Sequence, residues 1–310
     1  LGAETNFFDI PGLKENALEL KSFNNALEVR DAIWGRVEAA TPEEAVDIVI
    51  GGGGSTGVEL AGEVREWIAQ MRKEGHLCRT SVTLVDASLT ILKGFEEKII
   101  RQATNRLKKI GTNFLLEERV VKVSDGKVFL ESGRIVAYDI LIWTGGVKAN
   151  SIVDKLPFKK EAQGRINVGG ELLCVAEKPR KARKDFVHGP RGKVYGIGDI
   201  VCVHDGDGRP VPMVARAAII QGDIAAKNIL VDIKGGSHLK YNPKDYPYII
   251  PIGGKYAIAK IGPLTISGFL GWVLKGLVEL NYLFSIMPNV RALKIWIRGL
   301  KIFIQNDRLG

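Results

Sequence analysis

The stretch VIGGGGSTGVELAGE, residues 49–63, decides what kind of fold this chain adopts. Three of its glycines, Gly52, Gly54 and Gly57, form the pattern G-x-G-x-x-G, with Ala61 four residues further on. The first glycine permits a tight turn, the second lets the backbone approach a pyrophosphate, and the third lets a helix pack closely on a strand. The helix N-terminus then offers free N–H groups to phosphate. Since the pattern follows an apolar run and opens a helical one, it predicts a dinucleotide-binding turn.

The segments around this turn alternate between strand-like and helix-like patterns. EEAVDIVIGGGG (43–54) is typical of a buried parallel strand that enters a tight turn. We expect helices at 56–74 and 96–111, a strand at 81–87, and strands over 120–146 with a hairpin turn at Asp125-Gly126. Residues 43–146 therefore predict an α/β fold of the order β-α-β-α-β-β-β, the layout of a nucleotide-binding domain.

Two acidic residues near the glycine turn are candidate site residues. Asp86 ends the predicted second strand, where an acid accepts hydrogen bonds from the adenosine ribose and repels a 2′-phosphate, so we favour NAD over NADP. It lies 34 residues after Gly52, beyond the usual spacing of about 20, and a long intervening helix accounts for the excess. Glu59 either forms a capping box with Thr56 or has a second role beside the phosphate turn.

The second half of the chain continues with strand and helix patterns. KVYGIGDIV (193–201) predicts a strand that runs into Gly198-Asp199, where the aspartate either binds a polyol chain or caps a turn. Residues 214–233 predict a long Ala-rich helix, and 246–268 a hairpin around Gly253-Gly254. Two apolar-rich helices follow, separated at Pro288.

Composition narrows the classes of function. The chain has 310 residues with 45% hydrophobic and 25% charged, which is typical of a globular protein, and its net charge of +9 suits an anionic partner. Three distant cysteines without a C-x-x-C pair argue against a disulfide framework and a dithiol centre, and fit a reducing compartment. The four histidines show no metal-ligand spacing, so we expect no metal site. The basic loop EKPRKARKD (177–185) has no interleaved aromatics, and we interpret it as a solvated loop rather than a nucleic-acid site.

Several motifs in order resemble those of type II NADH dehydrogenases, which are single-subunit, non-pumping NADH:quinone oxidoreductases. They are GGGGSTGVELAGE, DILIWTGGVKAN, VYGIGD, the Ala-rich helix ending in Gln221-Gly222, and the basic tail. The resemblance implies two Rossmann-like dinucleotide-binding domains, with the NAD domain inserted into the FAD domain. It divides the chain into a remnant of the FAD domain (1–40), the NAD domain (41–150), the second FAD half (151–235) and a C-terminal part (236–310). Since only one glycine fingerprint is present, we expect the first FAD half to precede residue 1.

The resemblance also assigns cofactors and residues. It implies FAD as cofactor and NADH as substrate, with hydride passing from nicotinamide to flavin and electrons passing on to a membrane quinone. Glu59 would lie close to the flavin and help with protons. Arg216 and Ile220 replace the two glutamines of the family pattern A-Q-x-A-x-Q-x-G, so Arg216 either donates to a quinone carbonyl or forms a salt bridge. The implied cofactor ligands are Gly52, Gly54, Gly57, Asp86, Gly145 and Gly146 for NADH, and Gly198 and Asp199 for FAD.

The C-terminal segment fits an enzyme whose quinone stays in the bilayer. In residues 289–308 the cations Arg291, Lys294, Arg298 and Lys301 line one stripe of a helix whose other positions are mostly apolar. We expect this helix to lie on anionic lipid at the cytoplasmic face of the cell membrane, as a peripheral or monotopic anchor. Residues 268–287 contain two charges, which disfavours a span. The alternative is packing on the parent domain or in a homodimer.

Two other functions stay open at this stage. A sulfide:quinone oxidoreductase uses paired cysteines near its flavin; this chain has no obvious pair, although Cys174 and Cys202 could approach each other in space. A non-catalytic, membrane-associated NAD-binding module is the second alternative. Flavin bleaching by NADH or by sulfide distinguishes these possibilities.

Overall fold

The computed structural model describes residues 2–176, 193–206, 208–243 and 247–306. These residues form two compact units. Unit 1 comprises residues 1–6 and 147–246, and unit 2 comprises residues 7–146 and 247–310. The basic loop 177–185 lies outside the described residues.

Unit 2 is built on a five-stranded parallel sheet. Its strand order is β2 (Leu18–Glu19), β9 (Ile140–Trp143), β3 (Ala45–Gly51), β4 (Arg79–Val85) and β5 (Asn113–Leu115). The central strand β3 pairs in register with β4 (Ile50 with Leu84) and with β9 (Ile50 with Ile142). This sheet confirms the predicted α/β fold, and it places the glycine turn at the carboxyl end of the central strand.

The two faces of this sheet carry different layers because side chains alternate along each strand. Ile48 and Ile50 of β3 belong to a core that includes α2 (Phe23–Ala39), α3 (Ser55–Lys73) and α4 (Glu97–Lys109). Val49 instead joins the core beneath the antiparallel strands β6 (Val120–Ser124), β7 (Lys127–Leu130) and β8 (Ile135–Ala137), together with Leu13 of α1 (Leu13–Asn16). Asp125 and Gly126 both have positive φ angles, 52° and 68°, as the predicted hairpin turn requires.

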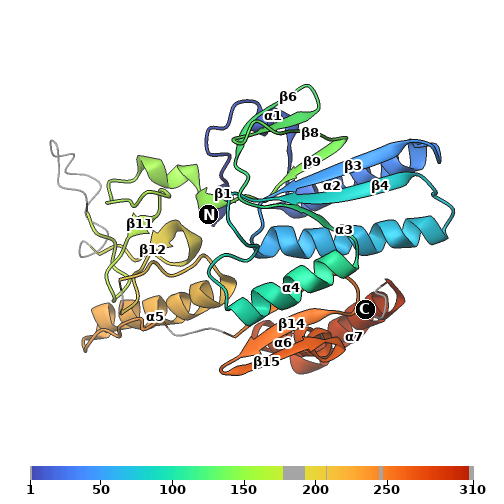
Figure 1. The fold of residues 1–310 in the computed structure, drawn as a ribbon. Coiled ribbons are helices and arrows are strands. Elements are labelled where there is room, and N and C mark those ends of the chain that lie inside the picture. Colours follow the sequence, from blue (N-terminus) through green and yellow to red (C-terminus); the bar gives the residue numbers. More distant parts are fainter. Residues whose placement is uncertain (1, 177–192, 207, 244–246, 307–310) are drawn as a thin grey trace. The chain divides into compact units, whose positions relative to one another are not determined.

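The C-terminal part of unit 2 is a three-stranded antiparallel sheet followed by two helices. The strands are β13 (Tyr248–Pro251), β14 (Ala257–Ile261) and β15 (Leu264–Gly268). Gly253 and Gly254, with φ of 67° and 61°, lie in the turn between β13 and β14, as predicted. The helices α6 (Phe269–Ile286) and α7 (Asn289–Asn306) are separated at Pro288 and pack on each other, with α6 also contacting β14 (Figure 1).

The described residues of unit 1 form short strands and one long helix. Strand β1 (Ala3–Thr5) pairs antiparallel with β10 (Val147–Ala149), which leads into η1 (Ser151–Lys155), and β11 (Ile166–Asn167) pairs parallel with β12 (Val201–Cys202). The predicted helix 214–233 is α5 (Ala215–Lys234). Its side chains Ala217 and Ala225 pack with Val201 and Ile166 in the core of this unit.

One predicted strand is wrong over most of its length. Residues 193–201 were expected to form a strand, but Tyr195 makes only an isolated bridge with Leu173, and residues Gly198–Ile200 form the 3-10 helix η2. Gly198 has a φ of 74°, which is incompatible with an extended strand, so the regular strand β12 starts only at Val201.

The division into units falls at different residues from the predicted domain boundaries. Residues 7–40 lie in unit 2, because Val29, Ile33 and Val37 of α2 are buried in the same core as β3. Residues 236–246 lie in unit 1, and residues 247–310 lie in unit 2.

Candidate functional site

The glycine turn after β3 has two positions that exclude any side chain. Gly52 has a φ of 110°, and a Cβ there would come within 2.6 Å of the backbone of Gly145. A Cβ at Gly57 would come within 1.9 Å of the carbonyl oxygen of Gly52. The Gly52 N–H donates to the carbonyl of Val85 at 2.8 Å, so the turn is tied to the end of β4. The first and third glycines of the motif therefore have the steric roles that the pattern predicts.

The second glycine of the motif, Gly54, stands beside open space. It is the N-cap of α3, and a Cβ added there would meet no atom of the chain within 4 Å. No side chain caps α3, so the predicted capping box of Thr56 and Glu59 is absent. The reason is that α3 begins at Ser55, which places Thr56 inside the helix instead of at its N-cap. The first N–H groups of α3 therefore lack an intrahelical partner beside a space that an anion can occupy.

Asp86 lies next to this turn and fixes it. One carboxylate oxygen, Oδ2, accepts a hydrogen bond from the Gly53 N–H at 2.6 Å, and Oδ1 accepts one from the Ser88 N–H at 2.7 Å. Strand β4 ends at Val85, so Asp86 occupies the strand end that the sequence predicted. Each carboxylate oxygen can accept a second hydrogen bond, so the side chain that orders the turn can still bind hydroxyl groups of a ligand.

The turn after β9 lies beside the glycine turn. The Thr144 hydroxyl donates to the carbonyls of Gly51 and Gly52, at 3.0 and 3.2 Å. The following residue, Gly145, lies against the Trp143 ring, with which a Cβ at Gly145 would clash at 2.4 Å. The structure therefore brings Gly52, Asp86 and Gly145 together at the carboxyl ends of three adjacent parallel strands, which is where α/β sheets bind ligands. Gly146 follows directly and is half-buried.

Glu59 lies in the second turn of α3 and is mostly buried. Burial raises the pKa of its carboxyl group from 4.5 to about 7, the Lys275 ammonium on α6 opposes that rise, and the Glu63 carboxylate adds to it. A carboxyl group with this pKa can both hold and release a proton near neutral pH. Since the capping box is absent, a structural capping role does not account for Glu59.

Gly198 and Asp199 lie in unit 1, at η2. The Gly198 N–H donates to Oε1 of Gln221 at 2.7 Å, so α5 holds the turn in place. Gly198, Asp199 and Gln221 line one small hollow together with Arg165, whose buried guanidinium donates to Glu161 and to the Val211 carbonyl. Neither residue was predicted as a site residue: Gln221 entered only as part of a motif, and Arg165 not at all. A Gly-Asp turn with a buried arginine beside it could hold the polar chain and phosphate of a cofactor.

Arg216, the remaining predicted site residue, is exposed in the first turn of α5. Ile220, one turn further along, packs against the core of unit 1. The two substitutions in the glutamine pattern therefore have different surroundings, and of the two only Arg216 presents a donor at the surface.

Comparison with known proteins identifies the family. The sequence pattern of the pyridine nucleotide-disulphide oxidoreductases matches residues 1–222, which is more than half of the chain. The chain belongs to the pyridine nucleotide-disulphide oxidoreductase family. The glycine turn described above lies within the matched residues.

Several curated proteins are similar to this chain over most of its length. The type II NADH:quinone oxidoreductase Ndh of Mycobacterium tuberculosis is 27% identical over 95% of this chain and 64% of its own length. An enzyme of the same name from Staphylococcus haemolyticus is 25% identical over 92% of this chain and 70% of its own length. The structure of NDH2 from Plasmodium falciparum in complex with NADH matches with a TM-score of 0.79 at 14% identity, covering 96% of this chain and 76% of that one, which shows a shared fold. The chain therefore spans about two thirds of the length of such relatives.

Two of the three cysteines, Cys174 and Cys202, have thiols whose ionisation is disfavoured by burial. All three are free thiols in the structure. Burial raises the pKa of Cys174 to about 11 and also raises the pKa of Cys202. Since the thiolate is the reactive form, Cys174 and Cys202 are poor nucleophiles at neutral pH. No cluster of three or more metal-ligating side chains occurs among the described residues.

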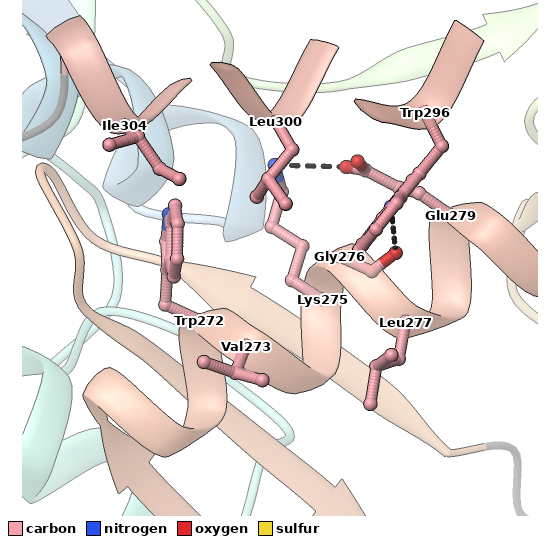
Figure 2. A pocket seen from close by; sticks show the side chains of 9 residues that line it. All are labelled: Trp272, Val273, Lys275, Gly276, Leu277, Glu279, Trp296, Leu300 and Ile304. Atoms are coloured by element: carbon pink, nitrogen blue, oxygen red, sulfur yellow. Dashed lines mark hydrogen bonds and ion pairs between the residues drawn. The ribbon is translucent and has the colours of Figure 1, made fainter. Parts of the chain in front are cut away.

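The C-terminal helices of unit 2 enclose an apolar groove (Figure 2). Its volume is about 210 Å³. Within it the Lys275 ammonium pairs with the Glu279 carboxylate at 3.0 Å, and the Trp296 indole N–H donates to the Gly276 carbonyl at 2.7 Å. The lining residues are Trp272, Val273, Lys275, Gly276, Leu277, Glu279, Trp296, Leu300 and Ile304. The indole hydrogen bond ties α7 to α6, so the two helices form one element.

Proposed function

We propose that this chain is the NADH-binding and quinone-reducing part of a flavin-dependent NADH:quinone oxidoreductase of type II, which pumps no protons. The observation that carries the proposal is the turn formed by Gly52, Asp86 and Gly145, because it offers a phosphate site, a ribose acceptor and a strand-end position for a nicotinamide ring in one place. The relatives from Mycobacterium tuberculosis and Staphylococcus haemolyticus are named for the same activity.

NADH is the proposed donor. Its pyrophosphate would lie on the N–H groups at the start of α3, beside the open space at Gly54. The Asp86 carboxylate would accept from the adenosine ribose hydroxyls, and its charge would repel the 2′-phosphate of NADPH. The nicotinamide end would approach Gly145-Gly146. Each of these interactions uses a group whose geometry the turn already fixes.

FAD is the proposed cofactor, held at the Gly198-Asp199 turn. A bound flavin accepts a hydride and passes electrons on singly or in pairs. The polar lining of the hollow, with Asp199 at η2, Gln221 on α5 and the buried Arg165, suits a polar chain that carries phosphate. These residues therefore fit one part of FAD, and they would form the corresponding part of its binding site.

Glu59 is the proposed proton donor. The reaction NADH + H⁺ + quinone → NAD⁺ + quinol consumes one proton in addition to the hydride. A mostly buried carboxyl group with a pKa of about 7 is half protonated at neutral pH, which suits it to deliver that proton. Arg216 is exposed and can donate to a quinone carbonyl, or else pair with a carboxylate as a structural residue.

The membrane surface is the proposed place of action, at the cytoplasmic face. Helix α6 is long and apolar enough to cross a membrane by length and composition alone, and only 6% of it is buried. Its Lys275–Glu279 pair and its packing on β14 favour a position against the interface instead. On α7, Ala292, Trp296 and Leu300 face inward, while Arg291, Lys294 and Arg298 are exposed and would bind anionic lipid. The exposed apolar side chains of α7, among them Leu293, Ile295 and Ile297, could instead pack in a homodimer.

The deciding experiment uses the full-length protein with its flavin bound. NADH should bleach the flavin absorbance, and addition of a quinone should restore it. Glu59→Gln should slow the quinone step at neutral pH more than the NADH step, whereas exposed Glu38→Gln, on α2, should slow neither. Bleaching by sulfide but not by NADH would establish the sulfide oxidoreductase alternative, and NADH binding without bleaching would establish the non-catalytic module.

A further inference from the structure

One buried arginine joins three separate parts of unit 2. Arg106 of α4 has a side chain that is only 4% exposed. Its guanidinium donates to the Glu66 carboxylate of α3 at 2.8 Å and to the carbonyls of Ile252 and Gly253 at 3.2 and 3.0 Å. It also lies over the Tyr256 ring, 4.9 Å from the ring centre. A single side chain thus connects two helices with the turn between β13 and β14.

The same turn lies directly on the backbone of α3. A Cβ at Gly62 would come within 2.7 Å of the Gly253 nitrogen, and a Cβ at Gly253 within 2.4 Å of the Gly62 carbonyl oxygen. Glu59, Gly62 and Glu66 are spaced three and four residues apart, so they lie on one face of α3. The face of α3 that carries Glu59 is therefore the face on which the turn is held.

A second close contact transmits this placement to α6. A Cβ at Gly271 would come within 2.2 Å of the Ala257 carbonyl oxygen, so the start of α6 packs on the start of β14. Lys275 lies four residues after Gly271 and hence on the same face of α6. Its charge acts on Glu59, as does that of Glu63 on α3, and Glu279 pairs with Lys275.

We propose that Arg106 is a positioning residue, which holds the β13–β14 turn on the face of α3 that carries Glu59 and thereby fixes the position of α6 and its Lys275 relative to Glu59. The proposal rests on the proton-delivering role proposed for Glu59. Its physical reason is the donor geometry of the guanidinium: it can satisfy a carboxylate and two turn carbonyls at once, which a lysine ammonium on a flexible stem cannot do in the same fixed plane.

The test measures the titration of Glu59 directly. The carboxyl carbon resonance of Glu59 is followed by NMR against pH in the full chain, in the unmodified protein, in Arg106→Lys and in Arg101→Lys. Arg101 is exposed on the same helix and serves as the matched control. In Arg106→Lys the turn and α6 should loosen and let water reach Glu59. Loss of burial lowers the Glu59 pKa, whereas moving the Lys275 charge away raises it; because burial is the larger cause, the pKa should fall, by about one pH unit, and Arg101→Lys should leave it unchanged.

The functional readout is separate from this measurement. At pH 7 a fall in pKa from about 7 to about 6 lowers the protonated fraction of Glu59 about fivefold. Quinone reduction by the flavin-loaded full-length protein should slow by a similar factor, while reduction of a water-soluble acceptor by NADH should not change. A shifted titration with an unchanged quinone rate would support the positioning role of Arg106 and contradict the role proposed for Glu59.

A second variant covers the case in which Arg106→Lys does not fold. Glu66→Gln keeps the shape and a hydrogen-bond acceptor at the partner position but removes its charge, so it should shift the Glu59 titration in the same direction by a smaller amount. If whichever of these variants folds leaves the Glu59 titration where it is in the unmodified protein, the positioning role of Arg106 is refuted.

Discussion

Replacing Glu59 with glutamine should change how the stability of unit 2 depends on pH. Burial raises the pKa of Glu59 from 4.5 to about 7, so the folded state binds a proton that the unfolded chain releases above pH 4.5. The free energy of unfolding of the unmodified protein must therefore fall as pH rises from about 4.5 to about 7. Glutamine cannot ionise, so Glu59→Gln should lose this part of the pH dependence.

The magnitude follows from the two pKa values. The interval from 4.5 to about 7, at about 1.4 kcal/mol per pH unit, corresponds to about 3 kcal/mol. Because Glu59 keeps some contact with solvent, we expect a smaller value. Between pH 4 and pH 8 the free energy of unfolding of the variant should rise by about 2 kcal/mol relative to that of the unmodified protein. Glutamine has nearly the same volume as glutamate, so packing contributes little to this difference.

Tryptophan fluorescence during urea unfolding is the suitable assay. All five tryptophans, Trp34, Trp67, Trp143, Trp272 and Trp296, lie in unit 2, so the signal reports on the unit that contains Glu59. Glu38→Gln, at an exposed position on α2, should give a stability curve parallel to that of the unmodified protein. If the curve of stability against pH for Glu59→Gln is also parallel to that of the unmodified protein, the pKa of Glu59 is not raised by burial, and the proton-donating role proposed for Glu59 is refuted.

Three further predictions concern binding. Asp86→Asn should weaken NADH binding, measured by calorimetry, about tenfold or more, because a hydrogen bond to a charged acceptor contributes about 1.5–3 kcal/mol. It should also narrow the preference for NADH over NADPH, and an unchanged preference would contradict the assignment of Asp86 to the ribose. Gly54→Ala should fold normally but no longer bind NADH, since its Cβ meets no atom of the chain and would occupy the space proposed for the ligand. Gly57→Ala should instead lower the melting temperature, because its Cβ would come within 1.9 Å of the Gly52 carbonyl oxygen; equal melting temperatures of the two variants would refute this distinction. Glutamine at both Lys294 and Arg298 should weaken binding to anionic vesicles by about 1 kcal/mol per removed charge, with no change for neutral vesicles.

The sequence by itself determined the features whose causes are local. The glycine turn, the Asp125-Gly126 hairpin and the Gly253-Gly254 turn all depend on residues that tolerate positive φ or close backbone approach, and the structure has them where predicted. The predicted helices α3, α4 and α5 fall within two residues of their predicted ends, because apolar periodicity and terminal residues are properties of a short segment, whereas α2 was not predicted. The position of Asp86 at a strand end follows in the same way.

Tertiary structure decided what depends on residues distant in sequence. The pattern Thr56-x-x-Glu59 suggested a capping box, but the turn starts α3 at Ser55, and the Glu59 carboxyl group is buried near Lys275, which lies 216 residues further along the chain. The alternation in residues 193–201 suggested a strand, but Gly198 is held in a left-handed conformation by Gln221. Arg106 has no sequence signature at all, because its partners Glu66, Ile252 and Gly253 become neighbours only when the chain folds. Burial, pKa and side-chain partnership are set by the sum of surrounding atoms, and no short stretch of sequence contains that sum.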